Sequence, residues 1–211
     1  MSKTLPPPQT TDDCEKSHHT PHGEAQQRAL VQAAHDLIAE KGFEGLRTRD
    51  VAARAGVNIA TLHYYFASKE DLIRGVVLYM REQFKGFHAP PPPSAASKPL
   101  DYVRQEFADA SYQVQEIIET CIVLFEICLR SLRDPAIKDA LDGLDGEWQL
   151  SFEAHLSEGI QQGIFRPDLD IRATASALIA FIKGTIFQLL FNPGAFPAER
   201  VYAQVERWLT D

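Results

Sequence analysis

The segment from Thr48 to Lys69 restricts what this chain can fold into more than any other stretch. It reads TRDVAARAGVNIATLHYYFASK. A short helix beginning at Thr48 is interrupted at Gly56, and a second short helix follows Asn58, whose side chain can cap it. Two helices of under three turns joined by a tight glycine-containing turn are typical of a helix-turn-helix unit. The second helix of such a unit enters the major groove of DNA, so the segment predicts a DNA-binding protein.

The distribution of charge fits this prediction. The net charge of −8 at pH 7 is unusual for a DNA-binding protein. Residues 24–88, however, carry nine lysines and arginines against eight carboxylates, whereas residues 89–211 carry 10 against 18. Basic side chains gather around the motif at Arg47, Arg49, Arg54 and Lys69. A local basic rim suits phosphate contacts, and an acidic remainder favours one docking orientation.

The apolar pattern predicts an all-α protein. Residues 24–41 repeat apolar side chains at the spacing of one helix face, and a longer helix follows Ser68, which can cap it, and continues to about residue 88. Five more helices are expected at about residues 100–115, 117–132, 135–162, 171–191 and 197–210. The sequence shows neither strand alternation nor an internal repeat.

Two segments lack this periodicity. Residues 1–23 are rich in proline, histidine and acidic residues, and we expect a disordered tail with no signal peptide. The tail contains the zinc-ligand types Cys14, His18, His19 and His22, but no structured context would hold them, so we favour a solvated tail and predict no metal or cofactor. Residues 89–99 hold five prolines and are expected to form a stiff linker.

Composition also bounds where the protein works. The longest apolar stretch, residues 173–191, contains Lys183 and several polar residues, which falls short of the roughly 20 apolar residues of a membrane helix. Cys14, Cys121 and Cys128 cannot all pair with one another, which favours a reduced, cytoplasmic chain. Cys121 and Cys128 lie on one helix face, where packing is favoured over the alternative of redox sensing.

The stretch AAHDLIAEKGFEGLRTRDVAARAGVNIATLHYYFASKEDL, which ends at Leu72, resembles the TetR family of bacterial transcriptional regulators. The shared features are a helix ending in GF, a threonine starting the next helix, the AGV turn, the TL–YF helix and SKEDL. The resemblance implies an N-terminal three-helix helix-turn-helix head (residues 24–70) joined by a long helix to a C-terminal antiparallel helical bundle. That second domain (residues 71–211) would bind an effector and form a homodimer.

Two arguments assign DNA contacts. The side chains on the outward face of the second helix, Thr61, His63 and Tyr64, are candidates for contacts with base edges. Arg47 and Arg49 would contact the DNA backbone and position the protein on it. The resemblance implies phosphate contacts for Thr48, Tyr65 and Lys69, whose structural alternatives are capping, core packing and a solvated charge. The predicted DNA-binding residues are Arg47, Thr48, Arg49, Asn58, Thr61, His63, Tyr64, Tyr65 and Lys69.

The second domain offers candidates for an effector pocket. Aromatic residues at helical spacing are by default core, but a helical bundle is a common place for a small-molecule pocket, and the resemblance favours one here. The candidates are Phe84, Phe107, Cys121, Phe125, Trp148, Phe152, His155 and Phe181. Ser151, four residues before His155, could add a polar contact.

The segment 173–191 is apolar on almost every side, and such a helix must be covered on all sides. One domain covers one face, so a partner is expected on the other. The resemblance implies a two-fold dimer built on the last two helices. The predicted interface residues are Leu178, Ile182, Ile186, Leu189, Val201, Val205 and Trp208.

These inferences favour a ligand-responsive repressor that a small molecule releases from a pseudo-palindromic DNA operator. Its expected partners are double-stranded DNA, a small-molecule effector and a second copy of itself, without a membrane. Two alternatives remain: a helical interaction module without DNA binding, and a small hydrolase using Ser151 and His155. The sequence contains no nucleophile elbow, metal pair or phosphate loop that would support an enzyme.

Overall fold

The computed structural model describes residues 21–90 and 98–211. Within these ranges it contains helices and no strand, so the predicted all-α class is confirmed. A 3-10 turn, η2 (Phe43–Gly45), which the sequence did not predict, connects the first two helices. The α-helices are α1 (Pro21–Lys41), α2 (Thr48–Arg54), α3 (Ile59–Tyr65), α4 (Lys69–Gly86), α5 (Lys98–Glu116), α6 (Ile118–Ser131), α7 (Pro135–Gln161), α8 (Ile171–Phe191) and α9 (Ala198–Thr210).

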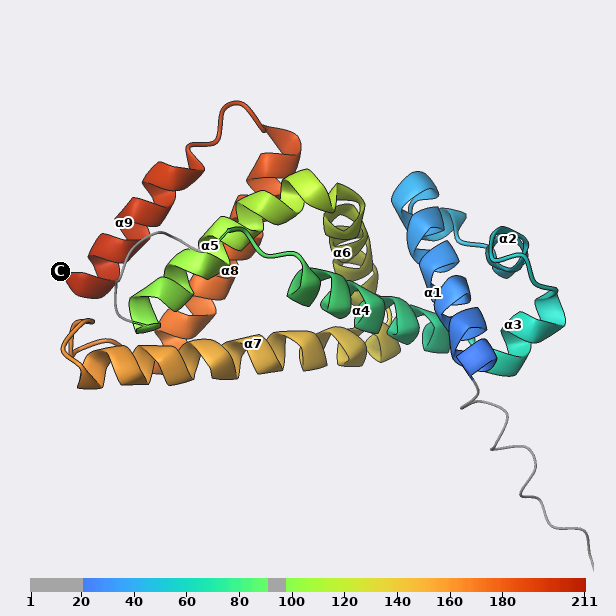
Figure 1. The fold of residues 1–211 in the computed structure, drawn as a ribbon, viewed down its shortest axis with the longest axis horizontal. Helices are drawn as coiled ribbons and strands as arrows, with labels where there is room; N and C mark the ends of the chain where they lie inside the picture. The colour runs from blue at the N-terminus through green and yellow to red at the C-terminus, as the bar shows by residue number, and fades with distance from the viewer. Residues whose placement is uncertain (1–20, 91–97) are drawn as a thin grey trace, which may run out of the picture.

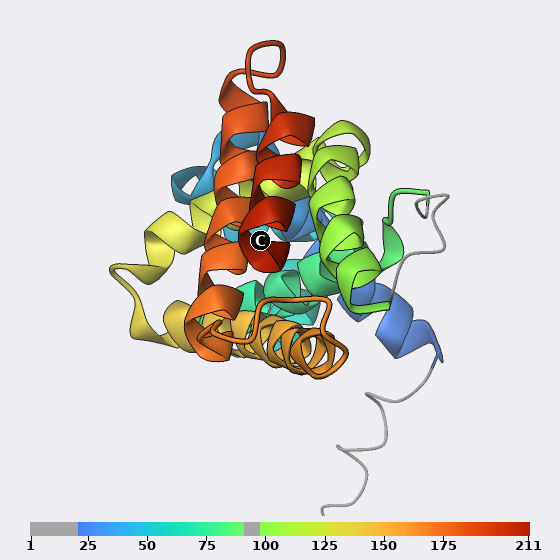
Figure 2. The ribbon, with the colours of Figure 1, turned by 90° about the vertical axis from the view of Figure 1, so that its left-hand side faces the viewer.

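The helices form a small head and a larger body (Figure 1). The head consists of α1, α2 and α3 at one end of the molecule. Helix α4 leaves the head and runs into the body, where α7 lies along its length. Helices α5, α8 and α9 stand side by side at the far end of the body, as Figure 2 shows. Helix α4 is therefore the element that reaches from one part to the other.

Local chemistry explains where several helices begin. Asn58, Ser68 and Asp170 cap α3, α4 and α8, because each side-chain oxygen accepts a hydrogen bond from the backbone N–H three residues later. Helix α2 is different: Arg47 occupies the cap position without a side-chain cap bond, and Thr48 is the first helical residue. The expectation that Thr48 caps this helix is therefore wrong.

Two predicted boundaries move by a few residues. Helix α1 begins at Pro21, so residues 21–23 of the predicted tail are helical, and His22 lies in this helix. The rest of the tail, with Cys14, His18 and His19, lies outside the described residues. Helix α5 begins at Lys98, with Pro99 in its first turn, where the missing proline N–H costs little. The predicted linker thus ends before residue 98, and its residues 91–97 also lie outside the described part.

Two hydrophobic clusters hold the molecule together. The first contains the apolar faces of α1 to α4 and extends into the body through Val123 and Ile127 of α6 and Ile137 of α7. The second is built from α5, α7, α8 and α9 around Phe107 and Phe152. The first cluster contains residues from both sides of the predicted domain boundary at residue 70. The hydrophobic core is therefore continuous across that boundary. The head and the near half of the body share one core.

Helix α8 is more apolar than expected. It is long and apolar enough, by length and composition, to cross a membrane, which contradicts the expectation that this stretch falls short. The core helix of a helical bundle passes the same test. Here α8 packs along α5 and α7, and Leu178, Ile182 and Ile186 of its inner face are at most 4% exposed. One third of the apolar window is buried, so α8 contributes one face to the core and leaves another face exposed.

This packing corrects the predicted dimer interface. Leu178, Ile182, Ile186 and Val205 belong to the core of the protomer and cannot face a second copy, so their assignment is wrong. Leu189 and Val201 are half-buried, and Trp208 is exposed. The large apolar residues that remain exposed on α8 and α9 are Phe181, Phe187, Phe191 and Trp208. Periodicity showed that α8 is apolar all round, but not which face its neighbours cover.

Candidate DNA-binding surface and effector cavity

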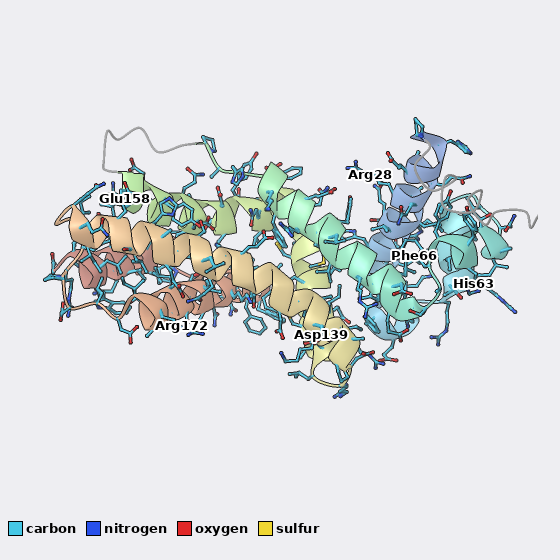
Figure 3. The ribbon with its side chains drawn as sticks, turned by 90° about the horizontal axis from the view of Figure 1, so that it is seen from below. Arg28, His63, Phe66, Asp139, Glu158 and Arg172 are labelled. Carbon is cyan, nitrogen blue, oxygen red and sulfur yellow. The ribbon has the colours of Figure 1, made fainter. Side chains whose placement is uncertain are left out.

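Helix α3 lies on the outside of the head. Leu62 and Phe66, four residues apart on the inward face of α3, point into the head core and are 1% and 4% exposed. Gly56 makes the turn before α3 with a φ of 70°, a conformation that glycine adopts without strain. His63 and Tyr64 are exposed, and Figure 3 shows His63 at the end of the head away from the body. Both residues are therefore accessible to a DNA groove.

Two other predicted contact residues are engaged within the head. The Thr61 hydroxyl donates to Asn58 Oδ1 at 3.1 Å, within the cap of α3. The Tyr65 hydroxyl donates to Gln26 Oε1 of α1 at 3.1 Å, and its ring packs against the head core. A DNA contact through either hydroxyl would have to replace or share these bonds. Their assignment as contact residues stays a prediction.

The basic rim is partly neutralised. Arg54 forms two hydrogen bonds of 2.7 Å with the carboxylate of Glu40, so its charge is already compensated. Arg47 Nη1 donates to the backbone oxygen of Glu44 at 3.0 Å, which holds the guanidinium beside α2. Arg49 is exposed on α2. These differences leave Arg47 and Arg49 as the better candidates for backbone phosphate.

Lys69 has a structural role that the sequence did not predict. Its Nζ donates to the backbone oxygen of Leu46 at 3.2 Å and lies 4.8 Å from the centroid of the Phe43 ring. Burial lowers the pKa of the Lys69 ammonium, because leaving water disfavours its charged form. The lysine thus ties the start of α4 to the α1–α2 connection.

Replacing Lys69 with alanine should therefore have two effects. The loss of the hydrogen bond to Leu46 should reduce the free energy of unfolding by about 1 kcal/mol. If the ammonium also meets phosphate, binding to all DNA sequences should weaken, and the salt dependence of binding should fall by about one unit. Urea unfolding and DNA titrations at several salt concentrations measure the two effects, with Lys138→Ala on α7 as the matched control. An unchanged salt dependence would assign Lys69 to the fold alone.

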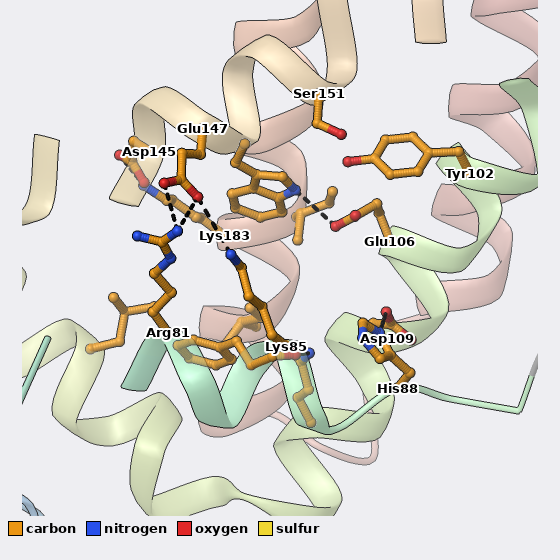
Figure 4. A pocket seen from close by; sticks show the side chains of 16 residues that line it. Arg81, Lys85, His88, Tyr102, Glu106, Asp109, Asp145, Glu147, Ser151 and Lys183 are labelled. Atoms are coloured by element: carbon orange, nitrogen blue, oxygen red, sulfur yellow. Dashed lines mark hydrogen bonds and ion pairs between the residues drawn. The ribbon is translucent and has the colours of Figure 1, made fainter. Parts of the chain in front are cut away.

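The body contains a cavity of about 400 Å³ beside the distal half of α4 (Figure 4). Its walls come from α4, α5, α6, α7 and α8. The apolar and aromatic lining residues are Phe84, Tyr102, Leu124, Trp148, Ile182 and Ile186. The polar and charged ones are Arg81, Lys85, His88, Glu106, Asp109, Gln113, Asp145, Glu147, Ser151 and Lys183. The volume and the mixed lining are those of a small-molecule site.

The structure places the eight residues predicted for an effector pocket in different surroundings. Phe84 and Trp148 line the cavity. The other six do not. Three of them are at most 1% exposed in the body core: Phe107, Cys121 and Phe152. The remaining three pack against other aromatic rings: Phe125 on Phe187, Phe181 on Trp208, and His155 on Tyr102. Burial also raises the pKa of the Cys121 thiol to about 12, which fits packing and not redox sensing.

The pair proposed for the hydrolase alternative has another arrangement. His155 Nδ1 lies 2.8 Å from the backbone oxygen of Ser151, and the imidazole stacks on Tyr102 with ring centroids 3.8 Å apart. A serine nucleophile needs a hydrogen bond between its hydroxyl and the base. These two contacts give the imidazole a structural role.

One side of the cavity carries most of its cations. Arg81 Nη2 of α4 lies 2.6 Å from a carboxylate oxygen of Glu147, and Lys85 Nζ approaches the same carboxylate at 3.4 Å. Lys183 of α8 donates to Asp145 at 2.6 Å. These contacts join α4 and α8 to α7, and Figure 4 shows those of Arg81 and Lys85 as dashed lines.

Glu106 of α5 lies on the opposite side. Trp148 Nε1 donates to its carboxylate at 2.8 Å, and the Tyr102 hydroxyl also bonds to it. Burial raises the pKa of Glu106, while these two neutral donors oppose the shift. Among the ion pairs of the described residues, none involves Glu106, although every other carboxylate of the lining has a cationic or histidine partner.

The end of α4 is fastened to α5 next to the cavity. Buried Asp109 accepts hydrogen bonds from His88 Nδ1 at 2.6 Å and from the backbone N–H of Ala89 at 2.7 Å. Gln113 Nε2 donates to the carbonyl of Phe84, in the last turn of α4, at 3.1 Å and to that of Phe87, the residue after the helix, at 3.0 Å. These bonds satisfy carbonyls that a helix end leaves without partners. The wall formed by α4 is thereby fixed at its distal end.

The contact between His88 and Asp109 should make stability depend on pH. The hydrogen bond to Asp109 raises the pKa of His88 above its value of about 6.5 in the unfolded chain. The stabilisation is then complete below about pH 6.5 and is lost as the pH rises through the folded-state pKa. We expect His88→Gln to cost more stability at pH 5.5 than at pH 9 in urea unfolding, with His63→Gln as control. An equal cost at both pH values would contradict this.

Sequence reasoning missed most of the polar lining. A signal was present: Arg81 and Lys85 of α4, and His88 just beyond its end, recur at helical spacing beside an apolar stripe. Glu106, Asp109 and Gln113 do the same on α5. Charged side chains beside an apolar stripe face either bulk solvent or an internal cavity. Only the positions of the neighbouring helices show which of the two they face.

Comparison with known proteins agrees with this architecture. Residues 30–76 match the family described as bacterial regulatory proteins, tetR family. Residues 105–211 match the family described as BetI-type transcriptional repressor, C-terminal. The transcriptional repressor KstR2 of Mycolicibacterium smegmatis is 28% identical over 189 residues, which cover 88% of this chain and 89% of that protein.

Solved structures show the same fold. A TetR transcription regulator from Haloarcula marismortui superposes with a TM-score of 0.73 at 20% identity, covering 88% of this chain and 97% of the other. The multidrug binding protein EbrR, solved in complex with imidazole, superposes with a TM-score of 0.63 at 25% identity, covering 91% and 92%. With its exposed α3, its cavity beside α4 and family matches over both parts, this chain belongs to the TetR family and is a ligand-responsive, DNA-binding regulator of transcription.

Proposed function

We propose that this protein is a homodimeric repressor that a small organic molecule releases from a pseudo-palindromic operator. The observation that carries the proposal is the course of α4. Its first residue, Lys69, bonds to Leu46 in the head, and its distal residues Arg81, Phe84 and Lys85 line the cavity. A ligand that displaces the distal half of α4 would therefore move the head. The relatives support this function, since KstR2 is named a repressor and EbrR a multidrug binding protein.

Helix α6 supplies a second connection. Leu124 lines the cavity, while Glu126 accepts a hydrogen bond of 2.9 Å from the backbone N–H of Phe43 in η2. One helical turn before Leu124, the hydroxyl of buried Thr120 lies 3.1 Å from His35 Nε2 of α1. The head is thus held by α4 on one side and α6 on the other. A ligand that favours a different spacing of these helices would shift the population of head orientations.

The dimer sets the geometry on DNA. We propose that the exposed residues Phe181, Phe187 and Phe191 of α8 and Trp208 of α9 meet their counterparts in a second copy. The two-fold symmetry of such a dimer would place two α3 helices about one DNA turn or more apart, which requires a pseudo-palindromic site. In each head, His63 and Tyr64, with Thr61, would read base edges. Arg47, Thr48, Arg49, Tyr65 and Lys69 would contact the backbone, while Asn58 holds the start of α3.

A gel-shift titration with the DNA upstream of the protein's own gene tests the first part. We expect one retarded complex containing two protomers, stronger than with scrambled DNA and weakened by salt. Light scattering on the free protein should give a dimer. A thermal-shift screen for ligands, followed by the same gel shift, tests release. A monomer in solution, or DNA affinity unaffected by every ligand that stabilises the protein, would contradict the proposal.

A further inference from the structure

We propose that the effector is an organic cation, with an apolar body and a protonated amine or related group, and that Glu106 selects it. This inference rests on the cavity being the effector site. It concerns the chemical class of the molecule that fills the cavity. Three observations support it: the ion pairing of the charged lining residues, the exposure of the cations opposite Glu106, and the aromatic and apolar side chains of the wall.

The charges of the lining single out Glu106. Glu147 is shared by Arg81 and Lys85, Asp145 is paired with Lys183, and Asp109 with His88. The hydrogen-bond donors to Glu106 are both neutral, Trp148 Nε1 and the Tyr102 hydroxyl, and the one histidine whose charge acts on it, His88, is bonded to Asp109 instead. A carboxylate removed from water without a cation is costly, and a bound cation would relieve that cost.

The excess positive charge on the other side is better solvated. Glu147 faces two cations, but the Lys85 side chain is 63% exposed and its Nζ is 3.4 Å from the carboxylate. Water can therefore stabilise Lys85 without a ligand. Glu106 is less exposed than Lys85, and Figure 4 shows it with Tyr102 and Ser151 beside it. The less exposed charge gains more from a bound partner, because it has lost more of its hydration.

The surroundings of Glu106 suit a cation with an apolar body. The rings of Trp148, Tyr102 and Phe84 are part of the wall, and the faces of aromatic rings attract cations. Leu124, Ile182 and Ile186 give the rest of the cavity an apolar surface. Its volume of about 400 Å³ lies within the range of sites for drug-sized molecules. The wall therefore offers an ion partner and a place for the hydrophobic part.

Two probes of matched shape test the proposal. 4-Phenylbutylamine, protonated at pH 7, and the neutral 4-phenylbutan-1-ol are titrated into the full-length protein in a calorimeter. We expect the cation to bind at least about 10-fold more tightly than the alcohol, since hydrogen bonds to charged groups contribute more than neutral ones. Glu106→Gln should weaken binding of the cation by roughly 10- to 100-fold and leave the alcohol almost unchanged. Glu158→Gln, at an exposed position of α7, should change neither.

Equal affinity for the two probes, no binding of the cation, or unchanged cation affinity in Glu106→Gln would each overturn the proposal. Thermal unfolding shows whether Glu106→Gln is folded. If it is not folded, two other measurements test the proposal. The first is the comparison of the two probes in the wild-type protein. The second is Glu106→Asp, which retains the charge and should retain the preference for the cation. A cation that binds but does not release DNA would count against the proposed repressor mechanism, and not against the selection by Glu106.

Discussion

Replacing both His63 and Tyr64 with alanine is expected to lower the affinity for operator DNA by roughly 100-fold or more. Each side chain that reads a base edge contributes about 1–3 kcal/mol of discrimination. Both residues are exposed on α3, and neither belongs to the head core formed by Leu62 and Phe66. The double variant should therefore remain folded, with a thermal midpoint close to that of the wild type.

Fluorescence anisotropy with labelled operator and unrelated DNA measures this effect. Loss confined to the operator indicates base contacts, because contacts to phosphate act on every sequence. Leu150→Ala, at an exposed position of α7, is the matched control and should bind both DNAs normally. An equal loss on both DNAs would assign His63 and Tyr64 to the backbone, and no loss would remove them from the interface.

Replacing Gly159 with alanine is expected to reduce the free energy of unfolding by about 3 kcal/mol. A Cβ at this position of α7 would lie 2.1 Å from Cδ2 of Phe165, whose side chain is 2% exposed. The ring cannot easily withdraw, because the N–H groups of Ile164 and Phe165 both bond to the oxygen of Gly159, at 2.9 and 3.2 Å. Overpacking of this kind typically costs 1–3 kcal/mol and occasionally more.

The same helix provides the control. Gly146 also lies in α7, but a Cβ there would meet no atom within 4 Å. Gly146→Ala should therefore stabilise the protein by up to about 1 kcal/mol, since alanine favours a helix over glycine. Urea unfolding monitored by circular dichroism compares the two variants. Similar free energies for both would show that Phe165 can rearrange.

Much of the fold is predictable because its determinants are local. The side chains of Asn58 and Ser68 cap α3 and α4. Gly42 and Gly56, which adopt positive φ angles, follow the ends of α1 and α2. These residues place α2, α3 and α4 correctly before any tertiary contact is known. They also place His63 and Tyr64 on the exposed side of α3, because the inward positions Leu62 and Phe66 are visible as a four-residue spacing.

The cavity and the exposed face of α8 were not predictable in the same way. Leu178, Ile182 and Ile186 looked suitable for a partner, but α5 and α7 cover them and leave Phe181 and Phe187 outside. Likewise, Phe107 and Phe152 fill the core, whereas Glu106 faces the cavity. The sequence by itself determined which helices form and which residues could be buried. Only the tertiary structure decided which helix covers which face, because that depends on contacts between residues far apart in the chain.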